Sequence, residues 1–128
     1  MLLAFSREAV RFMSAEIFTT GSGNVFVDLG FSEEEAAHLT MKSYLFDVLQ
    51  GAVRKALEAR TQEEVAKMMG ADQPIISKIL NDRMAGFSVE RITRYLTRLR
   101  YDICLKARPS PPEQKTGRVI GSREILTA

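Results

Sequence analysis

The residues whose types and spacing are best suited to binding another molecule lie in one short stretch, GADQPIISKIL, at positions 70–80. Gln73 stands near its start, and Ser77 and Lys78 interrupt its apolar run where a helix would direct them outward. A glutamine amide can pair bidentately with an adenine edge, lysine can donate to guanine or to phosphate, and serine can bond either kind of base. These side chains therefore suit a helix that reads base edges in the major groove of DNA.

A proline defines where this short helix begins. Pro74 is tolerated in a first helical turn, because the N–H that it lacks would have no partner there. Asp72 or Gln73 can provide the N-cap, and an exposed helix N-terminus suits a nearby phosphate. The apolar face that turns inward consists of Ile76, Ile79 and Leu80.

A second short helix is predicted immediately before the first. Thr61 and Glu64 have the spacing of a capping box, so a helix begins there, and Gly70 ends it in the usual C-terminal role. Only two residues then separate Gly70 from Gln73. Two short helices joined by a tight turn with a glycine have the layout of a DNA-binding helix-turn-helix.

Two longer helices flank this pair in the sequence. Ser32 and Glu35 form another capping box, which predicts a helix that bends near Thr40 and continues to about Arg60. After the pair, Ser88 caps a helix that runs to about Arg100, with Phe87 stapled onto Ile92. Both helices carry an apolar stripe at intervals of three and four residues, which predicts that they pack around a common core.

The ends of the chain carry weaker signals. Asn24–Asp28 is an extended candidate, and Ile103, Leu105 and Ala107 alternate with polar or small residues, which predicts a strand over 103–108. Such a strand must find a partner, either in the same chain or in a second copy. We therefore divide the chain into a flexible lead (1–23), one domain (24–108) and a disordered tail (109–128).

Composition narrows the function classes. The chain has 128 residues, of which 45% are apolar and 27% charged, as in a soluble globular protein of one domain. No apolar stretch is long enough to cross a membrane, and no signal peptide is apparent, so we expect a cytoplasmic protein. Cys104 and His38 are single, so we expect no disulfide within the chain, no metal site and no cofactor. No nucleophile stands with an available base, and we expect no enzyme and no catalytic residues.

Charge is unevenly distributed along the chain. Residues 1–53 contain three Lys and Arg against seven Asp and Glu, whereas residues 54–108 contain twelve against seven. The basic excess lies in the half that holds the helix pair, which favours an anionic partner there. Four side chains after the pair read as a solvated helix face rather than a second nucleic-acid site: Arg91, Arg94, Arg98 and Arg100.

The sequence TQEEVAKMMGADQPIISKILND, residues 61–82, resembles the helix-turn-helix of Cro/repressor-type (XRE family) regulators. The wider run, NVFVDLGFSEEEAAHL before it and GFSVERITRYLTRLRYDICLKARP after it, resembles the HigA-like antitoxin subgroup. The resemblance implies a mainly α fold: a compact bundle of about five helices with a lambda-repressor-like helix-turn-helix. To this we add the short C-terminal β-strand.

The resemblance also assigns roles to individual residues. It implies that Gln62 contacts phosphate and that Gln73 reads a base, as do the next positions on the same helix. The full set of expected DNA-binding residues is Gln62, Asp72, Gln73, Pro74, Ile75, Ser77, Lys78, Asn81 and Arg83. Three residues depart from the pattern: Asp82 replaces a glycine, Pro74 removes one usual polar contact, and Ile75 is apolar for an outward position.

Two functions remain open from the sequence. The first is a repressor that binds a palindromic double-stranded DNA operator as a homodimer, with residues 101–108 helping to form the dimer. The second is an antitoxin that neutralises a small basic ribonuclease toxin through its acidic segment, residues 24–47, and autoregulates its operon. A plain helical bundle with capped helices is the alternative to both.

Overall fold

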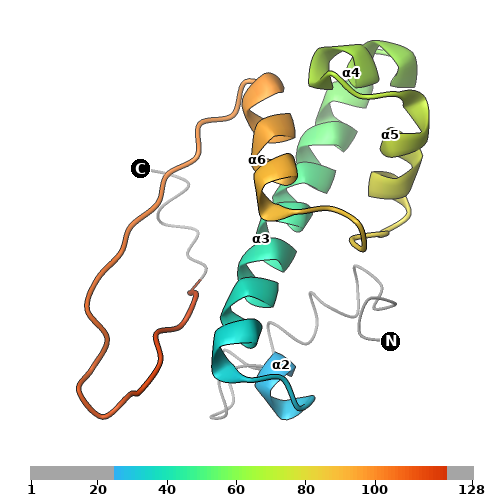
Figure 1. Ribbon diagram of the computed structural model, residues 1–128. Coiled ribbons are helices and arrows are strands. Elements are labelled where there is room, and N and C mark those ends of the chain that lie inside the picture. The colour runs from blue at the N-terminus through green and yellow to red at the C-terminus, as the bar shows by residue number, and fades with distance from the viewer. Residues whose placement is uncertain (1–24, 121–128) are drawn as a thin grey trace.

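The computed structural model describes residues 25–120, within which five helices follow one another (Figure 1). They are α2 (Val25–Asp28), α3 (Glu33–Leu57), α4 (Gln62–Met69), α5 (Gln73–Leu80) and α6 (Val89–Arg98). The predicted mainly helical bundle with a helix-turn-helix is confirmed. The lead predicted at 1–23 lies outside the described residues, as do residues 121–128 of the predicted tail.

The long helix α3 runs the length of the helical part and begins where the capping box predicts. The Glu35 amide donates to the Ser32 hydroxyl at 3.1 Å, and the Ser32 amide donates back to the Glu35 carboxylate at 3.3 Å. The helix is continuous through Thr40, near which a bend was expected, and the Thr40 hydroxyl donates to the Ala36 carbonyl. The helix ends at Leu57, three residues before the predicted end.

The core lies between the C-terminal half of α3 and the three helices that follow it. α6 packs along α3, and α4 and α5 lie together at the same end of that helix (Figure 1). Three aromatic rings link α3 to α6: Phe87 stands 5.5 Å from Phe46 and 6.4 Å from Tyr95 between ring centroids. The most deeply buried apolar side chains are Leu49, Val53, Val65, Met69, Ile76, Ile79, Ile92 and Leu96.

The segment predicted to be extended at Asn24–Asp28 is helical over the part that the structure describes, so this prediction is wrong. Val25–Asp28 forms one turn, closed by Gly30 at φ +100° and by the Phe31 amide, which donates to the Phe26 carbonyl at 3.1 Å. Phe26 is buried, and its ring packs edge-on against Phe31 at 6.5 Å. Burial of Phe26 against Phe31 and α3 overrides the strand preference of a short Val-Phe-Val run.

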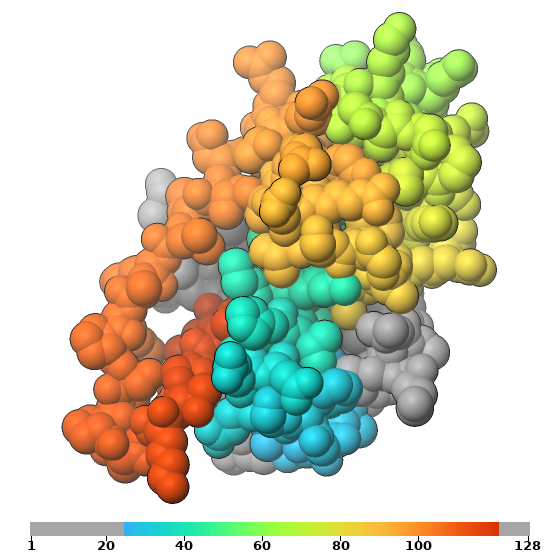
Figure 2. All heavy atoms as spheres, viewed as in Figure 1, coloured from blue at the N-terminus to red at the C-terminus, as the bar shows by residue number. Residues whose placement is uncertain are grey.

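The predicted C-terminal strand is also wrong: residues 25–120 contain no β-strand. After α6 the chain is extended without regular structure, and it runs back along the molecule toward the α2 end (Figures 1 and 2). Ile103 packs on the core, but Leu105 is 77% exposed, and Cys104 is exposed as well. A strand needs a neighbour to bond with, and the expected neighbour within the chain is a helical turn.

Within the same range no helix is long and apolar enough to cross a membrane.

Candidate nucleic-acid interface

The first helix of the pair, α4, is held at its start by the predicted capping box. The Glu64 amide donates to the Thr61 hydroxyl at 3.1 Å, and the Thr61 amide donates to the Glu64 carboxylate at 2.9 Å. The hydrogen bond from the Thr61 backbone lowers the pKa of Glu64, because it stabilises the charged form. The box leaves the neighbouring Gln62 side chain exposed at the first position of the helix.

Gly70 makes the turn between α4 and α5. It has φ 72° and ψ 32°, in the left-handed region, and its amide donates to the Lys67 carbonyl while that of Ala71 donates to the Ala66 carbonyl. These two bonds form the Schellman pattern that closes many helices. The Arg98 guanidinium of α6 covers the glycine, so that a Cβ at position 70 would lie 2.7 Å from its Nη1 atom. The angle between the two helices is thus set by a residue without a side chain.

The second helix, α5, starts at Gln73 with Pro74 in its first turn, as predicted. Asp72 occupies the N-cap position, but its side chain makes no capping hydrogen bond. The start of α5 therefore depends on the preset backbone angle of proline and on the turn before it. Asp72 keeps an exposed carboxylate beside the first turn.

Eight of the nine residues expected to bind DNA have exposed side chains. Ile75 is the exception: it is 9% exposed and belongs to the core cluster, so its predicted outward position is wrong. The α5 period explains this result, because Ile75, Ile76 and Ile79 all fall on the side that faces α3 and α4. The exposed eight are Gln62, Asp72, Gln73, Pro74, Ser77, Lys78, Asn81 and Arg83.

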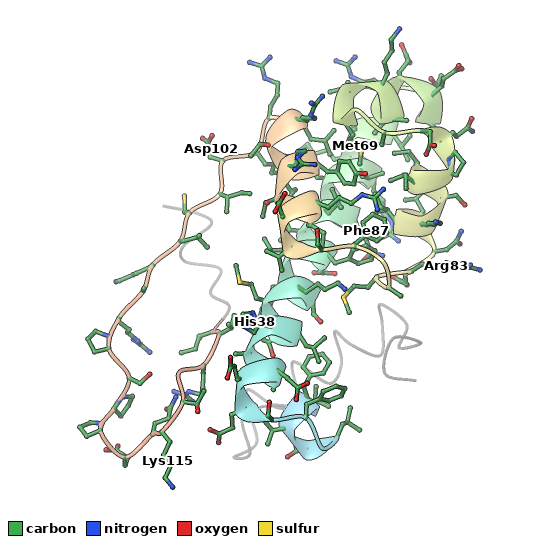
Figure 3. The ribbon with its side chains drawn as sticks, in the orientation of Figure 1. His38, Met69, Arg83, Phe87, Asp102 and Lys115 are labelled. Atoms are coloured by element: carbon green, nitrogen blue, oxygen red, sulfur yellow. The ribbon has the colours of Figure 1, made fainter. Side chains whose placement is uncertain are left out.

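Two glutamines from different helices meet at one point on this surface. The Gln73 side-chain amide donates to the Gln62 side-chain oxygen at 3.4 Å, although the two residues are eleven positions apart. One turn further along α5, the Asn81 amide donates to the Ser77 carbonyl at 2.9 Å and to its hydroxyl at 3.2 Å. The exposed face of α5 is thus a row of amide and hydroxyl groups, continued at its end by Arg83 (Figure 3).

The end of α5 is bonded by a residue of α3 that the sequence predictions do not name. Gln50 of α3 is fully buried, and its amide donates to the Ile79 carbonyl at 2.8 Å and to the Asp82 carboxylate. Asp82 has φ 60°, the left-handed conformation of the glycine that it replaces. A sequence signal for Gln50 does exist: it lies four residues after Phe46 and three before Val53, on the apolar stripe.

The four arginines of 91–100 do not form one solvated face. Arg91 is half-buried, with its guanidinium 5.1 Å from the Phe87 ring centroid and 5.6 Å from that of Tyr95, whose hydroxyl accepts a bond from Nε at 2.8 Å. Arg94 is exposed and pairs with Glu90 at 2.9 Å. For Arg91 the prediction is wrong, because the aromatic rings stack on its planar cation.

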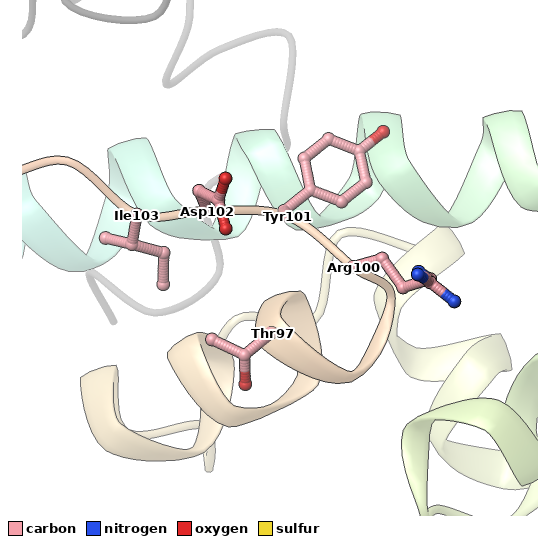
Figure 4. Close-up of a pocket in the computed structure, with 5 residues that line it drawn as sticks. All are labelled: Thr97, Arg100, Tyr101, Asp102 and Ile103. Carbon is pink, nitrogen blue, oxygen red and sulfur yellow. The ribbon is translucent and has the colours of Figure 1, made fainter.

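An open hollow lies where the chain leaves α6, around Arg100 (Figure 4). Arg100 takes the left-handed conformation at φ 72°, and the Tyr101 amide donates back to the Leu96 carbonyl at 3.0 Å. The residues that line the hollow are Thr97, Arg100, Tyr101, Asp102 and Ile103. None of them belongs to the expected DNA-binding set, so the hollow is a feature separate from the α5 surface.

Comparisons with known proteins agree with this geometry. A solved structure named as an XRE family transcriptional regulator is similar, with 27% sequence identity and a TM-score of 0.58, covering 69% of this chain and 97% of that one. No curated protein is significantly similar in sequence. The model of a family described as a helix-turn-helix domain matches residues 25–108, most of the chain. The protein belongs to this helix-turn-helix domain family.

Proposed function

We propose that this DNA-binding regulator is a repressor that recognises a palindromic operator as a homodimer, with α5 in the major groove. The observation that carries the proposal is the meeting of Gln62 and Gln73 on one exposed surface. The family match and the similarity to an XRE family transcriptional regulator support DNA binding and regulation. The repressor activity, the operator and the dimer are our inference.

The two glutamines have different roles in the proposed complex: Gln73 contacts a base and Gln62 contacts a phosphate. The Gln73 amide donates one proton to Gln62, so its carbonyl oxygen and its second proton remain for a base. That donor and acceptor match the N6 and N7 positions of adenine in the major groove. Gln62 retains its own amide protons at the start of α4, a position suited to a phosphate oxygen. Lys78 and Arg83, both exposed, add positive charge to this surface.

We infer a dimer because a single α5 would contact only a short stretch of DNA. Two copies of a helix-turn-helix read half-sites about 34–36 Å apart, which doubles the contacts to DNA. The segment 101–108 offers a surface for this purpose, because its apolar Leu105 is 77% exposed. We propose that the segment pairs with that of a second copy. Sedimentation of a chain that ends at Arg100 tests this: the truncated protein should be monomeric and bind the operator weakly, and a stable dimer would refute the role of the segment.

The operator contacts are tested by two substitutions with different readouts. Gln73→Ala should cost about 1–3 kcal/mol of binding free energy and relax the preference at one base pair. Gln62→Ala should weaken binding to all sequences about equally, because a phosphate contact carries no base information. Fluorescence anisotropy with a selected operator and its single-base variants measures both effects. Wild-type affinity in both variants would show that α5 is not the reading helix.

A second function, that of an antitoxin, is favoured by the placement of acidic residues. Glu33, Glu34 and Glu35 form the first turn of α3, at the opposite end of that helix from α4 and α5 (Figure 1). A small basic toxin bound there would leave the DNA surface open, so the same chain could also autoregulate its operon. Co-purification with a basic protein from a neighbouring gene supports this function. Retention of that partner after charge reversal at the three glutamates would refute the acidic site.

A further inference from the structure

One buried polar side chain ties the end of α5 to the central helix. Gln50 is 0% exposed, and its amide donates to Ile79 in the last turn of α5 and to Asp82, the second residue after that helix. α5 is otherwise held to α3 by apolar contacts, which resist separation but do not fix direction. The bonds from Gln50 are directional and fix how α5 ends.

Asp82 is an unusual residue for this position. It takes the left-handed conformation, and it completes the closing hydrogen bonds of α5: its own amide reaches the Ile79 carbonyl, and that of Arg83 reaches the Lys78 carbonyl at 3.0 Å. It also lies between Asn81 and Arg83, two exposed residues of the expected DNA surface. A carboxylate that points outward here would repel the phosphates that its neighbours are expected to meet.

Packing alone does not account for Gln50. Its side-chain oxygen is buried and has no hydrogen-bond partner among residues 25–120, which is unfavourable in a core. A methionine would fill the same space without that penalty. The amide instead meets two acceptors at the end of α5: the Ile79 carbonyl, which also accepts from the Asp82 backbone amide, and the Asp82 carboxylate, for which Gln50 is the donor from α3. The polar side chain therefore has a role toward Asp82.

We propose that Gln50 is a positioning residue that holds the Asp82 carboxylate against α3, away from the DNA backbone. Through this contact Gln50 sets the direction of Asn81 and Arg83 at the end of the recognition helix. The inference rests on the proposed function, because its consequence for binding requires α5 to lie in the major groove. It adds a residue from outside the helix-turn-helix to the determinants of DNA affinity.

The experiment is a rescue of DNA binding. Gln50→Met frees the carboxylate and should weaken operator affinity about tenfold, more at low salt than at high salt, since salt screens the repulsion. Gln50→Met combined with Asp82→Gly should restore affinity to within about threefold of wild type, because glycine accepts the left-handed conformation and removes the charge. Val53→Ala is the matched control: it removes buried volume from α3 away from Asp82, and should lower the melting temperature without changing affinity.

Each result of these measurements either supports or refutes the positioning role of Gln50. Wild-type affinity of Gln50→Met, or a double variant that stays as weak as the single one, would refute the positioning role. Amide NMR of the free protein gives a second test: the Gln50 side-chain protons should be slow to exchange and should shift in Asp82→Gly. An unchanged signal would refute the contact itself. Failure of wild type to bind any operator would instead refute the proposed function, and the NMR result would still decide the contact.

Discussion

Replacing Gly70 by alanine tests the geometry of the turn between α4 and α5. Gly70 lies at φ 72°, where a residue with a Cβ is less stable by about 1–2 kcal/mol. Alanine also restricts the unfolded chain, which returns about 0.4–1 kcal/mol. The new Cβ would lie 2.7 Å from Nη1 of Arg98, at the flexible end of that side chain, so Arg98 must move aside. We expect a net loss of about 1 kcal/mol in the free energy of unfolding.

The same substitution at Gly51 provides the control. Gly51 lies within α3, is exposed, and has nothing within 4 Å of the place where a Cβ would stand. Alanine is more stable than glycine inside a helix by about 0.5–1 kcal/mol, so Gly51→Ala should stabilise the protein. Thermal unfolding followed by circular dichroism should show opposite shifts, with a decrease of about 4–8 °C for Gly70→Ala.

The two variants, Gly70→Ala and Gly51→Ala, together can refute the requirement for a left-handed turn at Gly70. Because one methyl group is added in both variants, a general effect of alanine on the unfolded chain shifts both melting temperatures in the same direction. An increase for both would mean that the left-handed turn at Gly70 is not required. A decrease for Gly70→Ala with an unchanged Gly51→Ala would leave the turn argument intact and correct only the value assigned to the helix.

Two further predictions concern α6 and the start of α4. Arg91→Ala should lower the free energy of unfolding by roughly 1–2 kcal/mol, because it removes two ring contacts and a hydrogen bond to Tyr95. Arg94→Ala removes only an exposed ion pair with Glu90 and should change that free energy by less than about 0.5 kcal/mol. Urea titrations measure both values. The Glu64 carboxylate, whose pKa is lowered on folding, should stabilise the protein fully above its ordinary value of 4.5 and lose this contribution as the pH falls through its lower folded value. Glu64→Gln, which keeps the capping geometry, should therefore lose this part of the acid dependence of the melting temperature; an identical acid profile would contradict it.

The features that the sequence predicts correctly are those determined by residues close to one another along the chain. The capping boxes at Ser32 and Thr61 connect positions three apart, and the turn at Gly70 closes its helix through bonds that reach three positions back from Gly70 and five back from Ala71. Such patterns operate within one helical turn, so they can be recognised without the rest of the fold. For this reason the helix pair and its start and end positions could be predicted closely.

The incorrect predictions concern features that depend on contacts between residues far apart in the sequence. The 103–108 segment alternates like a strand, but alternation shows only that a strand could form if a partner were present. Ile75 was expected to face outward from the family pattern, whereas the core beneath α5 is wide enough to take it. The contact from Gln50 to Asp82 joins residues 32 positions apart, and only the packing of α3 against α5 brings them together.

The length of α3 has an electrostatic consequence. The helix separates the acidic first turn from the basic last turn, Arg54 and Lys55, by roughly 30 Å, since about 20 residues at 1.5 Å rise lie between them. Charges are screened over about 8 Å at physiological ionic strength, but over about 30 Å in 0.01 M salt. DNA bound at the proposed α5 surface would therefore hardly be affected by the three glutamates under physiological conditions. In dilute buffer it is repelled by them, so affinities measured there include a penalty that ordinary ionic strength removes.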